Sequence, residues 1–356
     1  MQRSVQIPED KSTKAVVWQQ PFSGYLPEKV LFILLFIIVN HEEVRMNNSG
    51  IDVIIPTYKP DKEFGELIDR LQRQTIPPGK IILMNTEEEL IQPFLKASRI
   101  LERYGNIEIH HVDRDEFDHG RTRHEGVQFS GAEFFLCMTQ DALPADERLV
   151  EELLAALKEE KVAVAYARQL PREDSTVLEE YTRSFNYPKV SRTKFVSDFK
   201  ELGIKTFFCS NVCAAYKRKI YDEQGGFIRR TIFNEDMIFA GGVINAGYGV
   251  AYRAEAKVIH SHHYTGRQQF CRNFDLGVSQ ADHPELFATV ASEKEGKKLV
   301  GEILRYLAKQ GKLIWIFPFI YESACKLLGY RLGKSYKKLP KAMVVKCSMN
   351  RNYWRL

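Results

Sequence analysis

The chain has 356 residues, 44% hydrophobic and 27% charged, with no low-complexity tract and no fixed repeat, so disordered and repeat proteins are excluded. Its length suits one large α/β domain with a smaller appendage, and six scattered cysteines favour a reducing compartment over a disulfide framework. The net charge of +5 is uneven, because residues 296–356 hold 14 Lys/Arg and two Asp/Glu while the remainder is acidic.

The N-terminal part of the chain carries one apolar run, residues 30–39. Ten residues fall short of the roughly 20 that a membrane-spanning helix needs, and the flanking charges do not suit a signal peptide. The run is either a buried strand or an interfacial anchor. Alternatively, the natural start is Met46, which lies just before the first clear strand. We therefore set residues 1–49 apart as an N-terminal extension, and these three alternatives for it stay open.

Apolar runs and helical spacing alternate through the next part of the chain. Short runs rich in Ile, Leu and Val predict buried strands, and apolar residues spaced three or four apart predict helices. Such alternation is typical of a parallel sheet with right-handed crossovers. Strands are expected at residues 51–56, 80–84 and 107–112, with helices at 63–74 and 90–104.

The same alternation continues to the middle of the chain and then gives way to a long polar stretch, residues 169–205. Loops of this length in a compact domain are usually functional. Residues beyond Pro284 are helical in pattern and basic, so we expect a domain over 50–283 and a basic helical region over 284–356. The intervening elements are helices at 121–130 and 148–159 and strands at 134–138, 162–167 and 256–259.

Candidate site residues follow the predicted strands, because ligands of parallel sheets bind beyond the carboxyl ends of the strands. Pro56, Thr57 and Tyr58 follow the first strand and offer amides and a hydroxyl to a nucleotide. Asp141 follows the strand at 134–138 and suits Mg²⁺ or Mn²⁺, which need only one or two carboxylates beside phosphate oxygens. Taken alone, Asp141 is more typical of a turn or a helix cap.

Two further motifs suggest chemistry. The adjacent acids Glu235 and Asp236 begin a predicted helix, where carboxylates are favoured for structural reasons as well. In a functional interpretation, one of them is a general base that accepts the proton of an attacking hydroxyl. Strand alternation places His260 and His262 on one face, and neutral imidazoles bind divalent ions. Three of the nine histidines lie within four residues, which favours a functional cluster.

Arg121 and Arg123 lie near the start of the predicted helix at 121–130, after Gly120. Backbone amides and guanidinium groups there could bind a diphosphate, although an ordinary loop-to-helix turn has the same pattern. Cys209 and Cys213 lie in an apolar run, which favours buried thiols over a zinc site. No phosphate-binding loop and no nucleophile elbow occurs, which argues against P-loop kinases and α/β-hydrolases.

The order of these motifs resembles bacterial glycosyltransferase family 2, and most closely its rhamnosyltransferase-like members, which build surface polysaccharides. The resemblance covers residues 51–277 and implies a GT-A fold, a Rossmann-like and mostly parallel sheet flanked by helices. It further implies inverting transfer from a nucleoside-diphosphate sugar, here dTDP-rhamnose. The segments that carry it are IIPTYKP, DHGRTRHEG, MTQDALP, FCSNVCAAY, NEDM, HSHHYT and RNFDLG.

The resemblance also implies roles for individual residues. Asp236 matches the catalytic base, with Glu235 as its neighbour at the acceptor. Asp141 matches the metal and diphosphate ligand, and His262 matches a further metal or diphosphate contact, with His260 as the alternative. The predicted nucleotide-sugar contacts are Pro56, Thr57, Tyr58, Asn85, Thr86, Arg121, Arg123, Gln140 and Asp141.

The sequence also departs from the family pattern. The usual Asp-x-Asp pair reads Thr139-Gln140-Asp141, so one acid is missing, and Asn85 or Thr86 stands where an acidic nucleotide contact is common. A complete Gln-x-x-Arg-Trp motif is absent, which favours transfer of single sugars over polymerisation. The missing acid supports the rival interpretation, a degenerate nucleotide- or glycan-binding protein. A nucleotidyltransferase is less well supported, because no glycine-rich loop follows the first strand.

The predicted partners follow from this interpretation. We expect a nucleoside-diphosphate sugar as donor, a polysaccharide or lipid-linked saccharide as acceptor, and no nucleic acid. The basic region over 284–356 is either a solvated helical face or a contact with an anionic membrane surface. We therefore expect a cytoplasmic enzyme, peripheral on the inner face of the cell membrane if the second interpretation holds.

Overall fold

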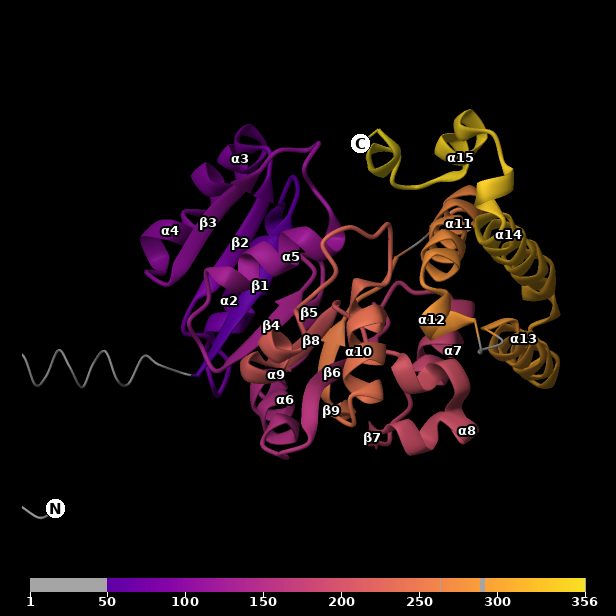
Figure 1. Ribbon diagram of the computed structural model, residues 1–356, viewed down its shortest axis with the longest axis horizontal. Helices are drawn as coiled ribbons and strands as arrows, with labels where there is room; N and C mark the ends of the chain where they lie inside the picture. Colours follow the sequence, from indigo (N-terminus) through magenta and orange to yellow (C-terminus); the bar gives the residue numbers. More distant parts are fainter. Residues whose placement is uncertain (1–49, 263, 289–291, 356) are drawn as a thin grey trace, which may run out of the picture. The chain divides into compact units, whose positions relative to one another are not determined.

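The computed structural model describes residues 50–262, 264–288 and 292–355 (Figure 1). The predicted extension over residues 1–49, with its apolar run, lies outside the described residues. The described residues contain one nine-stranded sheet in the order β3-β2-β1-β4-β8-β6-β9-β5, with β7 paired to β9. The strands are β1 Ile51–Thr57, β2 Ile81–Thr86, β3 Ile107–Val112, β4 Phe134–Met138, β5 Leu143–Pro144, β6 Val162–Leu170, β7 Arg192–Lys194, β8 Cys213–Lys217 and β9 Gly249–Ile259.

As predicted, most strands run in one direction, six of the nine, but four of the eight strand pairings are antiparallel, so the sheet is mixed. β1 lies between β2 and β4 and runs parallel to both, so chain order reverses at β1 and the carboxyl ends of these strands share an edge. β8 is inserted between β4 and β6 and runs antiparallel to both. The residues that precede Cys213 therefore reach the same edge at which β4 and β6 end. Side chains from widely separated parts of the sequence meet there.

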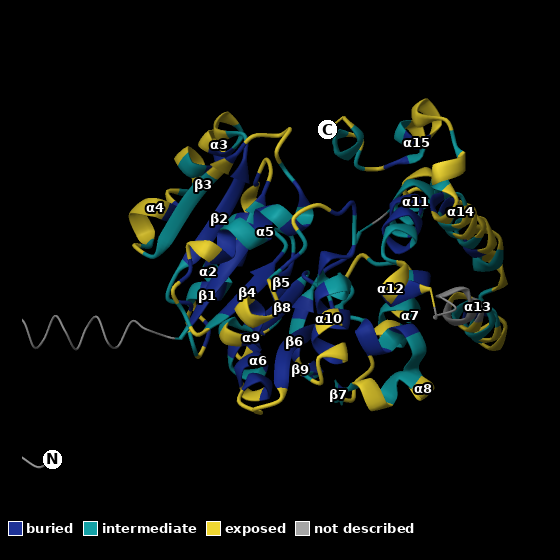
Figure 2. Cartoon of the chain, in the orientation of Figure 1, coloured by how far each residue is buried: buried dark blue, intermediate teal, exposed yellow. Residues whose placement is uncertain are grey.

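Helices cover both faces of the sheet, and each interface is a hydrophobic core (Figure 2). Alternate residues of β1 divide between the cores, since Ile51, Val53 and Ile55 face one side and Ile54 faces the other. The first core holds α2 Lys62–Gln72, α3 Glu88–Ser98, α4 Ile100–Arg103 and α6 Leu149–Leu157; the second holds α5 His119–Gln128, α9 Arg218–Glu223 and α10 Glu235–Asn245.

The helix predicted at 90–104 is divided in the structure. Arg99 adopts a left-handed conformation, with φ of 52°, and separates α3 from α4. α2 matches its prediction because Phe64, Leu67, Ile68 and Leu71 form one buried face. The Oδ1 atom of Asp61 accepts hydrogen bonds from the first free amides of α2, which fixes the start of this helix.

The polar stretch at 169–205 and the C-terminal residues form a second group of helices beside the sheet (Figure 1). The polar stretch contains the end of β6, then α7, β7 and α8, which fits the expected short elements. Small cores join α7, α13 and α14, and separately α11 and α15. The helices are α7 Val177–Asn186, α8 Phe199–Leu202, α11 Gly266–Asp282, α12 Pro284–Phe287, α13 Ser292–Lys309, α14 Ile316–Lys334 and α15 Lys341–Cys347.

α11 and α14 pack backbone against backbone. A Cβ atom on Gly333 would lie 2.1 Å from the carbonyl oxygen of Phe274, and one on Gly329 would lie 2.2 Å from that of Phe270. Only glycine permits this approach. α11 precedes the predicted domain boundary at 283 and α14 follows it, and the boundary itself stays a prediction. No helix in the described part of the chain is long and apolar enough to cross a bilayer.

Candidate active site

A cavity of about 820 Å³ opens at the carboxyl edge of β6 and β9. Its floor comes from the sheet and from the segment that precedes β8, and its outer wall comes from α7, α11 and α14. Polar and charged side chains converge on it from these elements. A cavity of this size with several convergent polar groups is the usual form of a binding site for a small ligand.

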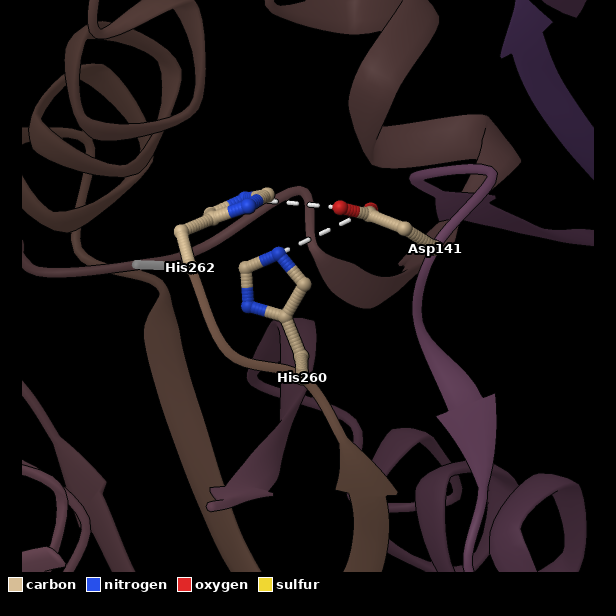
Figure 3. Close-up of side chains that lie close together, drawn as sticks. All are labelled: Asp141, His260 and His262. Carbon is tan, nitrogen blue, oxygen red and sulfur yellow. Dashed lines mark ion pairs between the residues drawn. The ribbon is translucent and has the colours of Figure 1, made fainter. Parts of the chain in front are cut away.

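His260 and His262 line the cavity, and Asp141 points toward both of them (Figure 3). The Nε2 atom of His262 lies 3.4 Å from Asp141 Oδ2, and the Nε2 atom of His260 lies 3.6 Å from Asp141 Oδ1. Asp141 follows β4, and the histidines follow β9. The structure thus brings together three residues for which the sequence predicted a metal site, and both histidines take part rather than one.

The ring of His260 is held in place from behind. Its Nδ1 atom lies 3.2 Å from Gln169 Oε1, and Gln169 donates a hydrogen bond of 3.0 Å to Ser210 Oγ. If Nδ1 carries the proton and donates to Gln169, the Nε2 lone pair faces Asp141 and is free to bind an ion. Such support behind a histidine is typical of metal ligands.

The protonation states also suit a metal. Burial lowers the pKa of His260 to about 3 and also lowers the pKa of His262, although Asp141 opposes both shifts. Burial raises the pKa of Asp141, but the two histidines outweigh it and the net pKa is lowered. At neutral pH, therefore, two neutral imidazoles face one carboxylate. This is the state in which all three side chains bind metals.

The spacing of the three groups fits one divalent ion. Neighbouring ligands about 2.1 Å from an ion in octahedral geometry are ~3 Å apart. The two distances between a histidine and Asp141, 3.4 and 3.6 Å, are close to this spacing, and all three ligand atoms lie within 4.8 Å of one another. Imidazole suits transition ions and carboxylate suits Mg²⁺ or Mn²⁺, so this donor set favours Mn²⁺ within the predicted pair. Octahedral coordination would leave open positions for phosphate oxygens.

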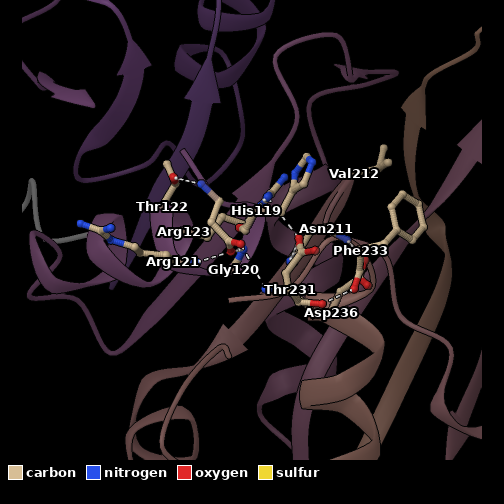
Figure 4. Close-up of polar contacts among 12 residues, drawn as sticks. His119, Gly120, Arg121, Thr122, Arg123, Asn211, Val212, Thr231, Phe233 and Asp236 are labelled. Atoms are coloured by element: carbon tan, nitrogen blue, oxygen red, sulfur yellow. Dashed lines mark hydrogen bonds and ion pairs between the residues drawn. The ribbon is translucent and has the colours of Figure 1, made fainter. Parts of the chain in front are cut away.

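Glu235 and Asp236 begin α10 and lie in the same cavity, but their environments differ (Figure 4). Glu235 is buried and forms an ion pair of 3.1 Å with Arg123. It also accepts a hydrogen bond of 3.1 Å from Asn211 Nδ2. Asp236 is partly exposed to the cavity and accepts bonds from the backbone amides of Asn211, at 2.9 Å, and Met237, at 2.8 Å.

These environments move the two pKa values apart. Burial and the adjacent charge of Glu235 raise the pKa of Asp236 to about 7. Burial also raises the pKa of Glu235, but Arg123 and His119 reverse this shift and the net pKa is lowered. Asp236 is thus able to exchange a proton near neutral pH, as a general base must. These environments favour Asp236 as the base, whereas the charge of Glu235 is balanced by that of Arg123.

The predicted diphosphate site at the start of α5 is occupied by other interactions (Figure 4). Asp118 Oδ1 accepts hydrogen bonds from the amides of Gly120, at 2.8 Å, and Arg121, at 3.1 Å. The guanidinium of Arg121 is paired with Glu125 at 2.7 Å and does not line the cavity. Arg123 lines the cavity, yet its charge is matched by Glu235. Both guanidinium groups thus have acidic partners, and a diphosphate contact by either arginine stays a prediction.

The predicted nucleotide contacts cluster at the carboxyl ends of β1, β2 and β4. Gln140 holds the loop after β1, since it accepts a bond of 2.7 Å from the Tyr58 amide and donates one of 3.1 Å to the Tyr58 carbonyl. Thr57 donates to Asn85 Oδ1 at 3.4 Å, and both side chains are buried. Pro56 and Thr86 lie on β1 and β2 beside them. None of these residues lines the 820 Å³ cavity described above.

The cavity also contains cationic residues that the sequence did not single out. Arg272 lies on α11 with its guanidinium carbon 4.7 Å from the ring centre of Phe233 and 5.6 Å from that of Tyr264. The positive charge of Arg272 lowers the pKa of both His260 and His262, so Arg272 lies near the cluster of Asp141 and the two histidines. No ion pair is formed by Arg272 within the described residues. The segment RNFDLG was part of the resemblance, but spacing alone gives Arg272 no role.

Comparison with known proteins supports the resemblance. Residues 52–225 match the model of glycosyl transferase family 2. The chain is 37% identical over 308 residues to the O-antigen chain rhamnosyltransferase RfbN of Salmonella typhimurium strain LT2, covering 85% of this chain and 96% of that protein. It is 36% identical to the O-antigen chain rhamnosyltransferase WbaN of Salmonella anatum, with 85% and 95% covered.

The fold is likewise that of a glycosyltransferase. The mannosyltransferase PcManGT of Pyrobaculum calidifontis, solved with GDP-Man and Mn²⁺, superposes with a TM-score of 0.56 at 14% identity, covering 81% of this chain and 88% of that one. At this identity the match concerns the fold alone, and it confirms the GT-A architecture expected from the sequence. Together with the near-complete coverage of the Salmonella proteins, these findings show that the chain belongs to glycosyltransferase family 2.

Proposed function

We propose that the chain is a metal-dependent, inverting rhamnosyltransferase that uses dTDP-rhamnose and extends a polysaccharide or lipid-linked saccharide. The observation that carries this proposal is a cavity lined by Asp236, whose pKa is about 7, and by His260 and His262, which form a cluster with Asp141. The names of the Salmonella relatives support rhamnose as the sugar. The enzyme class itself follows from the family.

Asp141, His260 and His262 would hold the metal. A divalent ion bound there would neutralise diphosphate charge and so make the nucleoside diphosphate a better leaving group. Arg272 replaces Arg121 and Arg123 in our proposal as the residue that supplies further positive charge, since it lies near the cluster without an acidic partner among the described residues. Gln140 keeps the loop at Tyr58 fixed at the edge where we place the nucleotide.

Asp236 accepts the proton of the acceptor hydroxyl. The amides of Asn211 and Met237 each donate to one of its oxygens, which fixes the carboxylate. The hydroxyl oxygen attacks the anomeric carbon from the face opposite the leaving diphosphate. A single displacement by the hydroxyl, assisted by one base, inverts the configuration at the anomeric carbon. Retaining glycosidases instead use two carboxylates and a covalent intermediate. α7, α11 and α14 would bind the acceptor, because they form the outer wall of the cavity.

Thermal unfolding tests the donor site, because a ligand that binds only the folded state raises its stability. Wild type and Asp141→Ala are compared with dTDP, UDP and GDP, each with and without Mn²⁺. We expect a metal-dependent rise with dTDP that the variant lacks. No rise with any nucleotide would refute the proposal and favour a degenerate binding protein. A rise without turnover of dTDP-rhamnose would refute the catalytic part alone.

A further inference from the structure

Parts of α14 are exposed (Figure 2), and several of its exposed side chains are large and apolar. Ile314, in the short helical turn that precedes α14, is 80% exposed, and Phe317 is 81% exposed. Ile320, Tyr321 and Leu328 are 51%, 61% and 58% exposed. The spacing of these five residues places them on one side of the helix, the apolar face. Large exposed apolar patches on folded proteins mark contacts with other proteins or with membranes.

The opposite side of α14 belongs to the cavity. Phe319, Glu322 and Lys326 line it, and Glu322 is the one acidic residue of α14. The apolar face therefore carries no negative charge. A single helix thus separates the proposed acceptor site from the exposed apolar face. Whatever binds that face lies within one helix diameter of the cavity.

The charge around the apolar face identifies its partner. Lys309 and Lys312 precede the face, and Lys334 and Lys338 follow it, with Lys309, Lys334 and Lys338 exposed. Residues 296–356 as a whole carry 14 basic and two acidic residues. Apolar side chains flanked by lysines are the pattern of helices that lie in the plane of a bilayer surface. An apolar insertion and a basic surface act together, because each signal alone gives weak binding to anionic membranes.

We infer that Ile314, Phe317, Ile320, Tyr321 and Leu328 insert into the surface of a membrane that contains anionic lipids. This inference rests on the proposed function for its purpose: a lipid-linked acceptor held in that membrane would enter the cavity along the inner side of α14. Membrane binding itself needs neither donor nor acceptor. It can therefore be tested separately from sugar transfer.

The test is sedimentation of the full chain with phosphatidylcholine vesicles, with and without phosphatidylglycerol. We expect binding that requires phosphatidylglycerol and weakens at high salt. The double variant Ile314→Ser/Phe317→Ser should lower the vesicle partition coefficient by at least about tenfold. The control is Val190→Ser/Val196→Ser, which removes two exposed apolar groups elsewhere in the chain, at 74% and 53% exposure, and should bind as wild type does.

Other occupants of the face give different results. Binding that the Ile314 and Phe317 substitutions leave unchanged would overturn the inference. So would a concentration-dependent dimer, seen by light scattering, that these substitutions dissociate without any effect on vesicles. A monomer that binds neither kind of vesicle would also overturn the inference. Turnover of dTDP-rhamnose without vesicles, measured on the same samples, reports separately on the proposed function.

Discussion

Asp236→Asn is the substitution that tests the proposed chemistry most directly. The variant keeps the shape of the side chain and removes its ability to accept a proton. General base catalysis contributes about 10²–10⁴-fold, so we expect the rate of transfer to fall by that factor. In the wild type, kcat/KM should rise about tenfold per pH unit up to pH about 7 and then level off, because only ionised Asp236 accepts the proton.

The same substitution also tests how the pKa of Asp236 affects the stability of the fold. The pKa of Asp236 is raised from 3.8 to about 7, so the folded state holds this proton more tightly than the unfolded chain does. The resulting stabilisation is complete below pH 3.8 and is lost as pH rises through about 7. Three pKa units correspond to about 4 kcal/mol, of which roughly 3 kcal/mol are lost above pH 5.

Asp236→Asn should abolish this loss of stability with rising pH. The amide can accept only one of the bonds from Asn211 and Met237, which costs about 1–3 kcal/mol at every pH. We therefore expect the variant to be less stable than wild type near pH 5 and equal or more stable near pH 8. Urea unfolding at both pH values measures the difference. Parallel pH dependences in wild type and variant would refute the raised pKa, and the exposed Asp115→Asn serves as control.

Three further substitutions test the surrounding structure. Glu235→Gln should lower the free energy of unfolding by about 3–5 kcal/mol in urea titrations, because it leaves the buried charge of Arg123 unpaired; a loss below ~1 kcal/mol would contradict the ion pair. His262→Ala should weaken Mn²⁺ binding in calorimetry by at least about a hundredfold, whereas unchanged affinity would place the ion elsewhere. Gly333→Ala should cost about 1–3 kcal/mol or more in thermal unfolding, since its Cβ would meet the Phe274 carbonyl at 2.1 Å, and a neutral effect would argue against the close packing.

The sheet could be predicted from the sequence because buried strands read as continuous apolar runs. β1 and β4 match their predicted ranges to within a residue. The break between α3 and α4 could not be predicted, because Arg99 carries no feature that favours the left-handed conformation it adopts. Strand alternation correctly placed His260 and His262 together, although both lie beyond the end of β9.

The partners of charged residues were the least predictable part of the site. Arg123 was expected at a diphosphate, but its partner Glu235 lies 112 positions later and reaches it only through the packing of α5 against α10. Arg121 looked equivalent to Arg123 in the sequence, but it lies two positions earlier in α5 and pairs with Glu125 instead. Ion pairs between residues so far apart in the sequence depend on the fold, and the spacing of residues along the chain does not predict them.

The cavity is formed by two parts of the chain that differ in how strongly the sheet core constrains them. Asp141, His260 and Asp236 are tied to the sheet and to α10, so a change in their surroundings disturbs the core. α7 and α14 reach the same cavity from outside the sheet and share a small core of their own with α13. Substitutions along their inner faces can reshape the cavity while the sheet stays intact. New glycosidic linkages could therefore arise in this family through substitutions in α7 and α14. Chimaeras that exchange these two helices offer a route to altered polysaccharides.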